Sequence, residues 1–197
     1  MGSVTQDYAS YIAALPKILA GAAVLFRDRA GRVLLVDPNY REGERKWILP
    51  GGTVESGQGE SPRQGARREV AEEIGLDVEP GALIAMDWVT RADRPPLAVY
   101  LYDGGVLDEE QLGAIRLQEE ELDAWNLVPL DQVGTFASPE MEGRIRAGFA
   151  ALMAGTGTAE LENGHRVGPA PAVDHTRRVG PASTVHHTGR TGQRPTA

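Results

Sequence analysis

The sequence predicts an α/β (α+β) domain in which strands and helices pack in layers. Apolar runs of strand length, such as 17–27 and 97–102, are separated by polar turns. A helix with clear start and stop signals is expected over 61–74, and apolar residues recur at helical spacing over 139–153. Strands interrupted by one central helix, with a second helix after them, bury their apolar faces by stacking the helices on a sheet.

Length and composition indicate one folded domain with extensions. A chain of 197 residues with 41% hydrophobic residues can bury one good core. We expect a lead-in over 1–16, the folded domain over 17–154 and a tail over 155–197. The tail is rich in glycine, proline and threonine and contains a near-repeat, so it is predicted to be disordered. All four histidines lie there; histidine-rich tracts can bind transition metals, but a low-complexity extension is the favoured interpretation.

Several classes of protein are excluded by what the sequence lacks. There is no cysteine, so disulfides and thiolate chemistry are excluded. No apolar run approaches the roughly 20 residues that a membrane span needs, and no signal peptide pattern opens the chain. We therefore expect a cytoplasmic protein without a membrane partner. The net charge of -8 argues against stable nucleic-acid binding.

The strands are expected in order along the chain. The runs 17–27 and 32–37, joined by a short turn, predict a hairpin. Trp88, Tyr100 and Tyr102 are interpreted as core residues in preference to base-stacking ones. The remaining strands are expected at 47–49, 83–89, 97–102, within 112–117, and at 125–130.

The helix over 61–74 has strong boundary signals. Ser61 is a typical N-cap residue, Pro62 suits the first helical position, and Gln64 stands where a capping-box partner would reach back. Gly75 is the residue type that ends helices in a left-handed conformation.

This helix carries three carboxylates on one side. At about 100° per residue, Glu69, Glu72 and Glu73 fall within an arc of roughly 100°. Like charges this dense repel one another unless solvent or cations separate them. Spacing alone favours a solvated face. The glycine turn at 50–52, which can present a bare carbonyl, shifts the interpretation toward a Mg²⁺ site that is shared with phosphates.

The stretch from Gly52 to Leu76 resembles the signature of the Nudix hydrolases. Glu60 is followed by seven residues and then by Arg68-Glu69-Val70-Ala71-Glu72-Glu73-Ile74-Gly75-Leu76, which matches the second half of that signature at every fixed position. The first half departs from it, because seven residues separate Gly52 from Glu60 where the pattern has five. We interpret Gln58-Gly59 as an insertion in a tolerant loop.

The resemblance implies a mixed β-sheet sandwiched between helices, and hydrolysis of a diphosphate bond in a nucleoside diphosphate linked to another group. The expected cofactor is Mg²⁺, with Mn²⁺ as an alternative, because such ions neutralise phosphates and lower the pKa of bound water. The expected metal ligands are Glu69, Glu72, Glu73 and the Gly51 carbonyl. Glu69 is also the candidate base for water or the group that orients it, with Arg68 holding Glu69 and Glu60 supporting the site.

Residues outside the signature are weaker candidates. The candidates for substrate binding are Arg41, Arg45, Lys46 and Trp47. The three basic residues either meet an anionic part of the substrate or form a soluble loop. The loops 40–46 and 90–96 are the candidates for specificity. Members of the family often use an additional acidic residue, for which Glu119, Glu120 and Glu121 are the candidates, although a solvated acidic turn is the favoured interpretation.

Two alternative functions match the residues less well. A Nudix-like module could sense a nucleotide ligand without cleaving it, but a binder has no need of three crowded carboxylates. Isoprenoid diphosphate isomerases share the fold, but their catalytic cysteine has no counterpart here. Many relatives pair, so the resemblance allows a homodimer.

Overall fold

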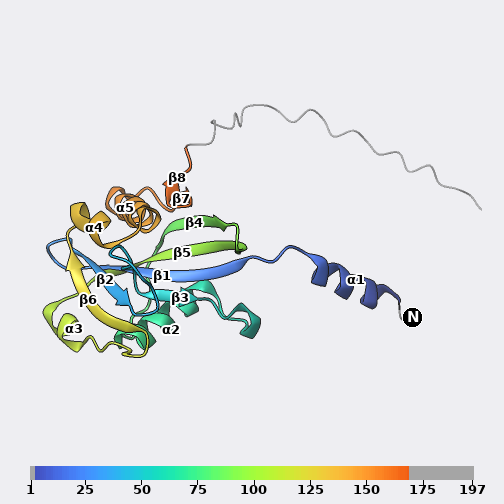
Figure 1. The fold of residues 1–197 in the computed structure, drawn as a ribbon, viewed down its shortest axis with the longest axis horizontal. Coiled ribbons are helices and arrows are strands. Elements are labelled where there is room, and N and C mark those ends of the chain that lie inside the picture. Colours follow the sequence, from blue (N-terminus) through green and yellow to red (C-terminus); the bar gives the residue numbers. More distant parts are fainter. Residues whose placement is uncertain (1–2, 169–197) are drawn as a thin grey trace, which may run out of the picture. The chain divides into compact units, whose positions relative to one another are not determined.

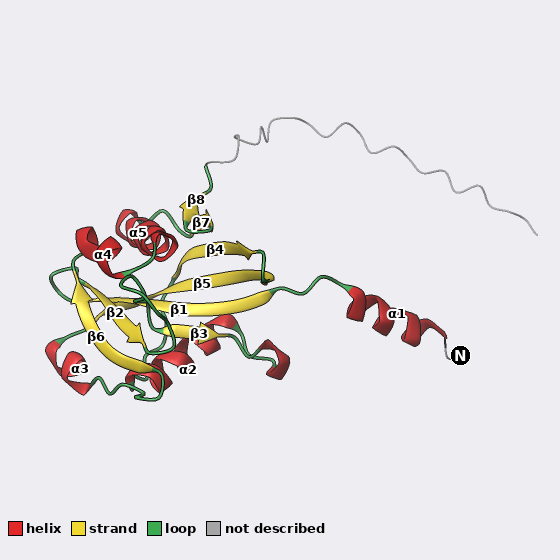
Figure 2. Cartoon of the chain, in the orientation of Figure 1, coloured by secondary structure: helices red, strands yellow, loops and turns green. Residues whose placement is uncertain are grey.

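The structure is a computed structural model that describes residues 3–168. Its main unit contains one sheet, in the strand order β6-β2-β1-β5-β4-β7-β8, with β3 paired to β1 (Figures 1 and 2). The strands are β1 (Leu19–Arg27), β2 (Val33–Pro38), β3 (Gly51–Thr53), β4 (Leu83–Arg91), β5 (Arg94–Val106), β6 (Leu122–Val128), β7 (Ala159–Glu162) and β8 (His165–Arg166). The helices are α1 (Ser3–Ala14), α2 (Pro62–Ile74), α3 (Glu109–Ala114), α4 (Val133–Phe136) and α5 (Pro139–Ala154), with single 3-10 turns at Ser56–Gln58 and Leu130–Gln132.

The sheet is mixed, as the resemblance implied. β1 runs parallel to β5 and β4 runs parallel to β7, whereas the other pairings are antiparallel. The predicted hairpin of β1 and β2 is confirmed. The expected strand at 47–49 forms only an isolated bridge between Val36 and Ile48, and the regular pairing with β1 begins two residues later, at Gly51.

Both faces of the sheet are covered, so the central strands are buried on both sides. Successive side chains of a strand point to opposite faces, and β1 contributes to two separate cores. Leu25 packs in the cluster that contains Ile145 of α5, and Phe26 packs in the cluster that contains Val70 and Ile74 of α2. The helices therefore enclose the sheet, with α2 and α5 on opposite faces (Figure 1).

The expectation of a strand within 112–117 is wrong. Residues 109–114 form helix α3, whose N-cap Asp108 accepts a hydrogen bond from Gln111 N at 2.9 Å while the Gln111 side chain bonds back to Asp108 N. This capping box sets the helical start. The apolar residues that suggested a strand, Leu112 and Ile115, instead fill the α2 side of the core.

The tail also begins later than predicted. β7 and β8 extend the sheet beyond β4, and the side chains of Ala159 and Leu161 are buried while Glu160 and Glu162 point outward. Asn163 and Gly164, both with positive φ, make the turn between them. His165 lies in β8, and the other three histidines and the near-repeat from 169 onward lie outside the described residues.

A smaller expectation concerns the aromatic residues of β4 and β5. Tyr102 is buried, and Trp88 and Tyr100 are partly buried, in agreement with their interpretation as core residues. No helix within residues 3–168 is both long and apolar enough to cross a membrane.

Candidate active site

Helix α2 begins and ends at the predicted residues. The Ser61 hydroxyl accepts a hydrogen bond from Gln64 N, and the Gln64 side chain accepts one from Ser61 N at 2.9 Å, which completes a capping box. Gly75 closes the helix in a left-handed conformation with φ 72°. Because both ends are set locally, the position of the glutamates along the helix follows from the sequence.

The apolar side of α2 seats the helix against the sheet and brings its acidic side next to β3. Ala66, Val70 and Ile74 are almost fully buried. Gly51 N donates a hydrogen bond to Glu73 Oε2 at 2.7 Å. A Cβ atom at position 52 would lie 2.6 Å from the Glu69 carboxylate. Gly52 is therefore needed because the Glu69 carboxylate lies directly against the β3 backbone, whereas a Cβ atom at Gly51 would meet the β1 backbone at Ala22 and Ala23.

Arg68 links the carboxylates around it. Its Nη1 lies 3.0 Å from Glu69 Oε1 and 2.9 Å from Glu72 Oε2. Its Nε and Nη2 donate to the two oxygens of Glu60, at 2.8 and 3.1 Å. Nη2 also donates to the Thr53 carbonyl at 3.0 Å. The predicted contact between Arg68 and Glu69 is present, and the same guanidinium fixes the loop before the helix.

The two-residue insertion leaves Glu60 in contact with the helix. Of the two extra residues, Gln58 ends a 3-10 turn at Ser56–Gln58, and Gly59 follows this turn with φ 82°. Glu60 Oε2 also accepts a hydrogen bond from Glu55 N at 2.7 Å. Hydrogen bonds from Arg68, and then from the Glu55 backbone, lower the pKa of Glu60. The loop absorbs the insertion, and Glu60 stays an ionised partner of Arg68.

The three glutamates on α2 differ in burial and in charge. The Glu72 side chain is half exposed, whereas the Glu69 side chain retains 15% of its accessible surface and Glu73 is fully buried. Burial raises the pKa of Glu69 despite the nearby guanidinium of Arg68. Burial, reinforced by neighbouring carboxylates, raises the pKa of Glu73 to about 8 even though the Gly51 N–H opposes the shift.

Of the three candidates for an additional acidic residue, Glu121 is the one whose charge reaches the site. Its carboxylate contributes to the raised pKa values of Glu69 and Glu73. Asn39 holds this loop through hydrogen bonds to the carbonyls of Glu119, Glu120 and Glu121, at 3.4, 3.1 and 2.9 Å. All three side chains are exposed, so solvent reaches them as well.

The donor chemistry of the site suits a divalent cation. Within residues 3–168 no three acidic or histidine side chains converge as a ready-made metal site, because Arg68 bridges three of the glutamates and Glu73 is turned toward Gly51. Besides burial, neighbouring carboxylates nevertheless contribute to the raised pKa values of Glu69 and Glu73, so the region carries excess negative charge. Oxygen ligands with excess negative charge are what Mg²⁺ and Mn²⁺ require.

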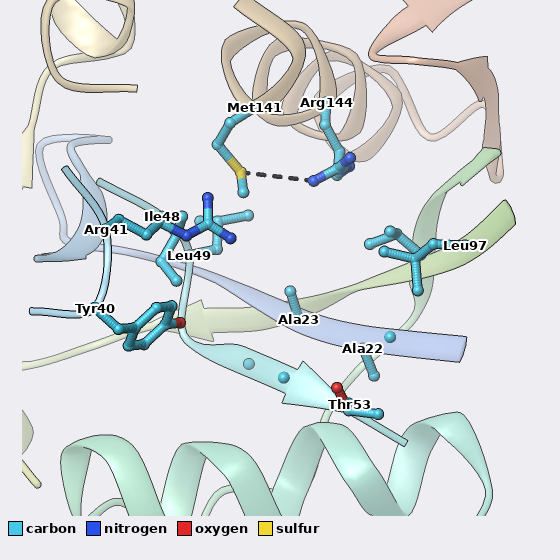
Figure 3. A pocket seen from close by; sticks show the side chains of 14 residues that line it. Ala22, Ala23, Tyr40, Arg41, Ile48, Leu49, Thr53, Leu97, Met141 and Arg144 are labelled. Carbon is cyan, nitrogen blue, oxygen red and sulfur yellow. Dashed lines mark hydrogen bonds between the residues drawn. The ribbon is translucent and has the colours of Figure 1, made fainter. Parts of the chain in front are cut away.

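A cavity of about 240 Å³ lies beside β3 and adjoins the glycines (Figure 3). Tyr40 and Arg41 lie at one side of it, and Met141 and Arg144 reach toward it from α5. Gly51 and Gly52 line the cavity and also contact the α2 carboxylates. A ligand in this cavity would therefore be separated from the acidic helix by the β3 backbone (Figure 3).

The basic loop supplies one cavity residue out of the four that were candidates. Arg41 lines the cavity, whereas Arg45 is exposed to solvent and is not among the residues that line it. Lys46 Nζ instead lies 3.0 Å from Asp37 Oδ1, and the Trp47 ring packs edge-on against Phe136 at 5.6 Å between centroids. The sequence-based prediction of substrate contacts is thus not supported for Lys46 and Trp47, which have structural partners.

Sequence reasoning did not identify Tyr40, Met141 or Arg144 as cavity residues. Tyr40 lies in the loop 40–46, which was a candidate for specificity. Nothing in the sequence indicated that the two α5 residues line a cavity. The helical spacing of Met141 indicated only an apolar face. Arg144 is held in place by a residue of strand β4 that lies 57 residues earlier in the chain.

A mixed sheet between helices, with a glycine strand against an arginine-linked acidic helix, defines the class of the Nudix hydrolases. The chain belongs to this family: residues 17–151 match the model of the NUDIX domain. The predicted family is confirmed, and with it the class of enzyme, a hydrolase acting on phosphoric anhydride bonds.

Solved structures resemble the chain in fold. A MutT protein from Methanosarcina mazei Go1 is 25% identical, with a TM-score of 0.55 over 72% of this chain and 96% of that one. A C. elegans Ap4A hydrolase is 24% identical, with a TM-score of 0.53 over 70% and 98% of the two chains. An ADP-ribose pyrophosphatase from Streptococcus suis is 19% identical, with a TM-score of 0.51 over 73% and 98%.

Proposed function

We propose that the protein is a Mg²⁺-dependent hydrolase that cleaves the diphosphate bond of a nucleoside diphosphate linked to another group, or of a related nucleotide. The observation that carries this proposal is the contact of the glycine strand with the acidic helix. Gly51 bonds to Glu73, and Gly52 leaves room for Glu69, directly beside the cavity. A substrate in the cavity would place its phosphates at the β3 backbone, on whose other side lie the carboxylates that can hold a cation.

Each residue of the acidic helix has a role in this proposal. Glu69, Glu72 and Glu73 would hold the metal, together with the Gly51 carbonyl and with Glu121 as the additional acidic residue. When bound, the metal supplies charge neutralisation at the phosphates and a lower pKa for coordinated water. Manganese could replace magnesium, since the ligands are carboxylate and carbonyl oxygens.

The chemical step is attack of water on phosphorus. The water oxygen forms a bond to one phosphorus while the bond from that phosphorus to the bridging oxygen breaks, and the bridging oxygen leaves with the other phosphate. Glu69 would accept the proton of the attacking water. Its raised pKa suits a general base that works near neutral pH. Arg68 holds Glu69 in orientation, and Glu60 holds Arg68.

The test is turnover of a panel of substrates by the full chain. ADP-ribose, a nucleotide sugar, a dinucleoside polyphosphate and a nucleoside triphosphate would be incubated with and without MgCl₂, and nucleoside monophosphate and phosphate would be measured. We expect Mg²⁺-dependent product from at least one of them, with no product in EDTA. The side chain of the proposed ligand Glu72 is half exposed, and its only ion-pair partner within residues 3–168 is Arg68, so Glu72→Gln should fold normally and lose this turnover.

The alternative is a Nudix-like module that binds a nucleotide without cleaving it. Thermal stabilisation by a member of the panel, with no product after long incubation in MgCl₂, would favour this alternative and overturn the hydrolase. The family often forms pairs, and a homodimer stays a prediction that the molar mass in solution would test.

A further inference from the structure

A second depression, rich in arginine, adjoins the candidate substrate cavity. It has a volume of about 120 Å³ and shares Arg41, Met141 and Arg144 with the larger cavity. The β4–β5 turn adds Arg91 and Arg94 to its lining. This turn lies within the loop 90–96 that the sequence marked as a candidate for specificity. Four guanidinium groups from three separate parts of the chain thus gather beside the cavity.

Arg144 is a buried residue with one donor group that lacks a good acceptor. It is only 8% exposed, and its Nε and Nη2 both donate to Asp87 Oδ2, at 3.0 and 2.6 Å. Within the described part of the chain, the acceptor of its Nη1 is the Met141 sulfur at 3.8 Å (Figure 3). A thioether is a weak acceptor, and a buried guanidinium donor that lacks an oxygen partner is costly. A ligand oxygen in the cavity would satisfy this donor.

The arginines also leave positive charge unneutralised. Asp87 neutralises Arg144, and Glu140 forms an ion pair with Arg91. Neither Arg41 nor Arg94 has a carboxylate partner among residues 3–168. Arg41 lies 5.9 Å from the Tyr40 ring centroid, and Arg94 donates only a long bond of 3.5 Å to the Pro95 carbonyl. Two guanidinium groups without a carboxylate partner among residues 3–168 and the Arg144 donor therefore face one region.

The position of this region relative to the acidic helix limits the chemical class of the group that could bind there. The glycines that contact Glu69 and Glu73 line the larger cavity, whereas Arg91 and Arg94 line only the smaller depression, beyond Leu97 and Val99. The scissile diphosphate needs the glycine side of the cavity. The arginine depression is then available to another part of the same substrate, and that part should be anionic.

We propose that Arg41, Arg94 and Arg144 form a subsite for a phosphate group that is separate from the scissile diphosphate. The preferred substrates are then nucleoside diphosphate derivatives that carry an additional phosphomonoester. This inference rests on the proposed hydrolase function and names its substrate class. Arginine suits the role because its planar fork bonds to two phosphate oxygens at once.

The test compares substrate pairs that differ by one phosphomonoester. Coenzyme A and 3′-dephospho-coenzyme A form one pair, and NADPH and NADH form another; all four contain a diphosphate. We expect kcat/KM to be higher for the phosphorylated member of at least one pair by about tenfold or more, the effect of one charge-assisted contact. Arg41→Gln and Arg94→Gln should each lower this ratio, and the double variant should bring it close to one.

Arg29→Gln is the matched control. Arg29 is an exposed arginine in the β1–β2 turn, at the opposite end of β1 from the arginine depression, because Leu19 pairs with Leu97 whereas Arg27 pairs with Val106. Its substitution removes the same charge and should leave the ratio unchanged. An equal loss of preference in this control would show a non-specific effect of net charge and would overturn the subsite.

A binding measurement separates failure of the subsite from failure of the hydrolase. The dissociation constants of both members of each pair would be measured by calorimetry in EDTA, where no turnover is expected. Tighter binding of the phosphorylated member, lost in the double variant, supports the subsite even if no diphosphate is cleaved. Equal binding and equal turnover within both pairs would overturn the subsite while leaving the hydrolase intact.

Discussion

Arg68 and Glu73 lie in the same candidate site, but their charged groups have different kinds of partners. Arg68 contacts Glu60, Glu69 and Glu72, so it offsets the repulsion that three carboxylates would otherwise exert on one another. Within the described part of the chain, Glu73 has no cationic partner and instead accepts a hydrogen bond from the Gly51 N–H. The residue that is most buried is therefore also the one whose ionisation is most costly.

Substitution of the helix carboxylates tests the assignment of roles. Glu69→Gln should reduce kcat by at least about 10²-fold, the usual contribution of a general base. Glu72→Gln should abolish most Mg²⁺-dependent turnover because a neutral amide is a poorer ligand. Both would be measured by nucleotide release, with urea denaturation as the check on folding. Glu109→Gln, on the exposed start of α3, is the control, and turnover equal to wild type in both site variants would refute the roles.

The raised pKa of Glu73 predicts how stability depends on pH without metal. Its pKa in the folded protein, about 8, lies above the ordinary glutamate value of 4.5, so the folded state holds the proton more tightly. The contribution of Glu73 is fully present below about pH 4.5 and is lost as the pH rises through 8. In EDTA, the free energy of unfolding of wild type relative to Glu73→Gln should therefore fall between pH 5 and 8. A difference that is independent of pH would contradict this.

At the scale of elements, the site depends on a helix and a strand that approach without intervening side chains. β3 is only three residues long, Gly51–Thr53, yet it pairs with β1 on one side and contacts the α2 carboxylates on the other. The loop between them, which contains the insertion, is anchored by Glu60. Short elements that are held at several points can position polar groups with little freedom.

Gly52→Ala tests this close approach. The added Cβ would lie 2.6 Å from the Glu69 carboxylate, so the carboxylate must move away from its position beside Arg68. We expect a loss of turnover of at least about tenfold, because small displacements of catalytic groups are costly, with little change in melting temperature. Gly57→Ala is the matched control, since its Cβ would meet nothing within 4 Å. Equal activities of the two variants would show that Glu69 needs no fixed position.

At the scale of the whole molecule, a buried ion pair ties three distant segments together. Asp87 of β4 pairs with Arg144 of α5 and accepts a hydrogen bond from Gly164 N in the β7–β8 turn. The strands after α5 are thus connected to the same arginine that lines the candidate substrate cavity. Their presence in the sheet makes them part of the folded unit.

Truncation separates this segment from the low-complexity sequence that follows. Removal of everything after Gly157 exposes the surface that Leu161 covers and deprives Asp87 of one donor. The free energy of unfolding should fall by at least about 2 kcal/mol, the usual cost of losing one large buried aliphatic side chain. Truncation after Gly168 should leave it unchanged, as the composition of the tail predicts. Urea denaturation of both variants checks this, and equal stabilities would return the domain boundary to residue 154.

Much of the fold and the central part of the site could be predicted from the sequence because they depend on local signals. The caps of α2 lie within three residues of its ends, and the spacing of Glu69, Glu72 and Glu73 fixes their common side. The β1–β2 hairpin likewise follows from two apolar runs and a short turn. The insertion was also placed correctly in a loop, since helices do not tolerate two extra residues without rotating their side chains.

Other features were decided only by tertiary packing. Burial distinguishes Glu73 from Glu72, and no residue spacing contains that information. A strand was expected within 112–117, but residues 109–114 form α3, because the apolar residues of this segment can face the core from a helix as well as from a strand. Arg144 lines the cavity only because Asp87, on a distant strand, holds it there. Sequence patterns determine local conformation and common faces, whereas burial and long-range pairing arise when the chain closes on itself and water is excluded.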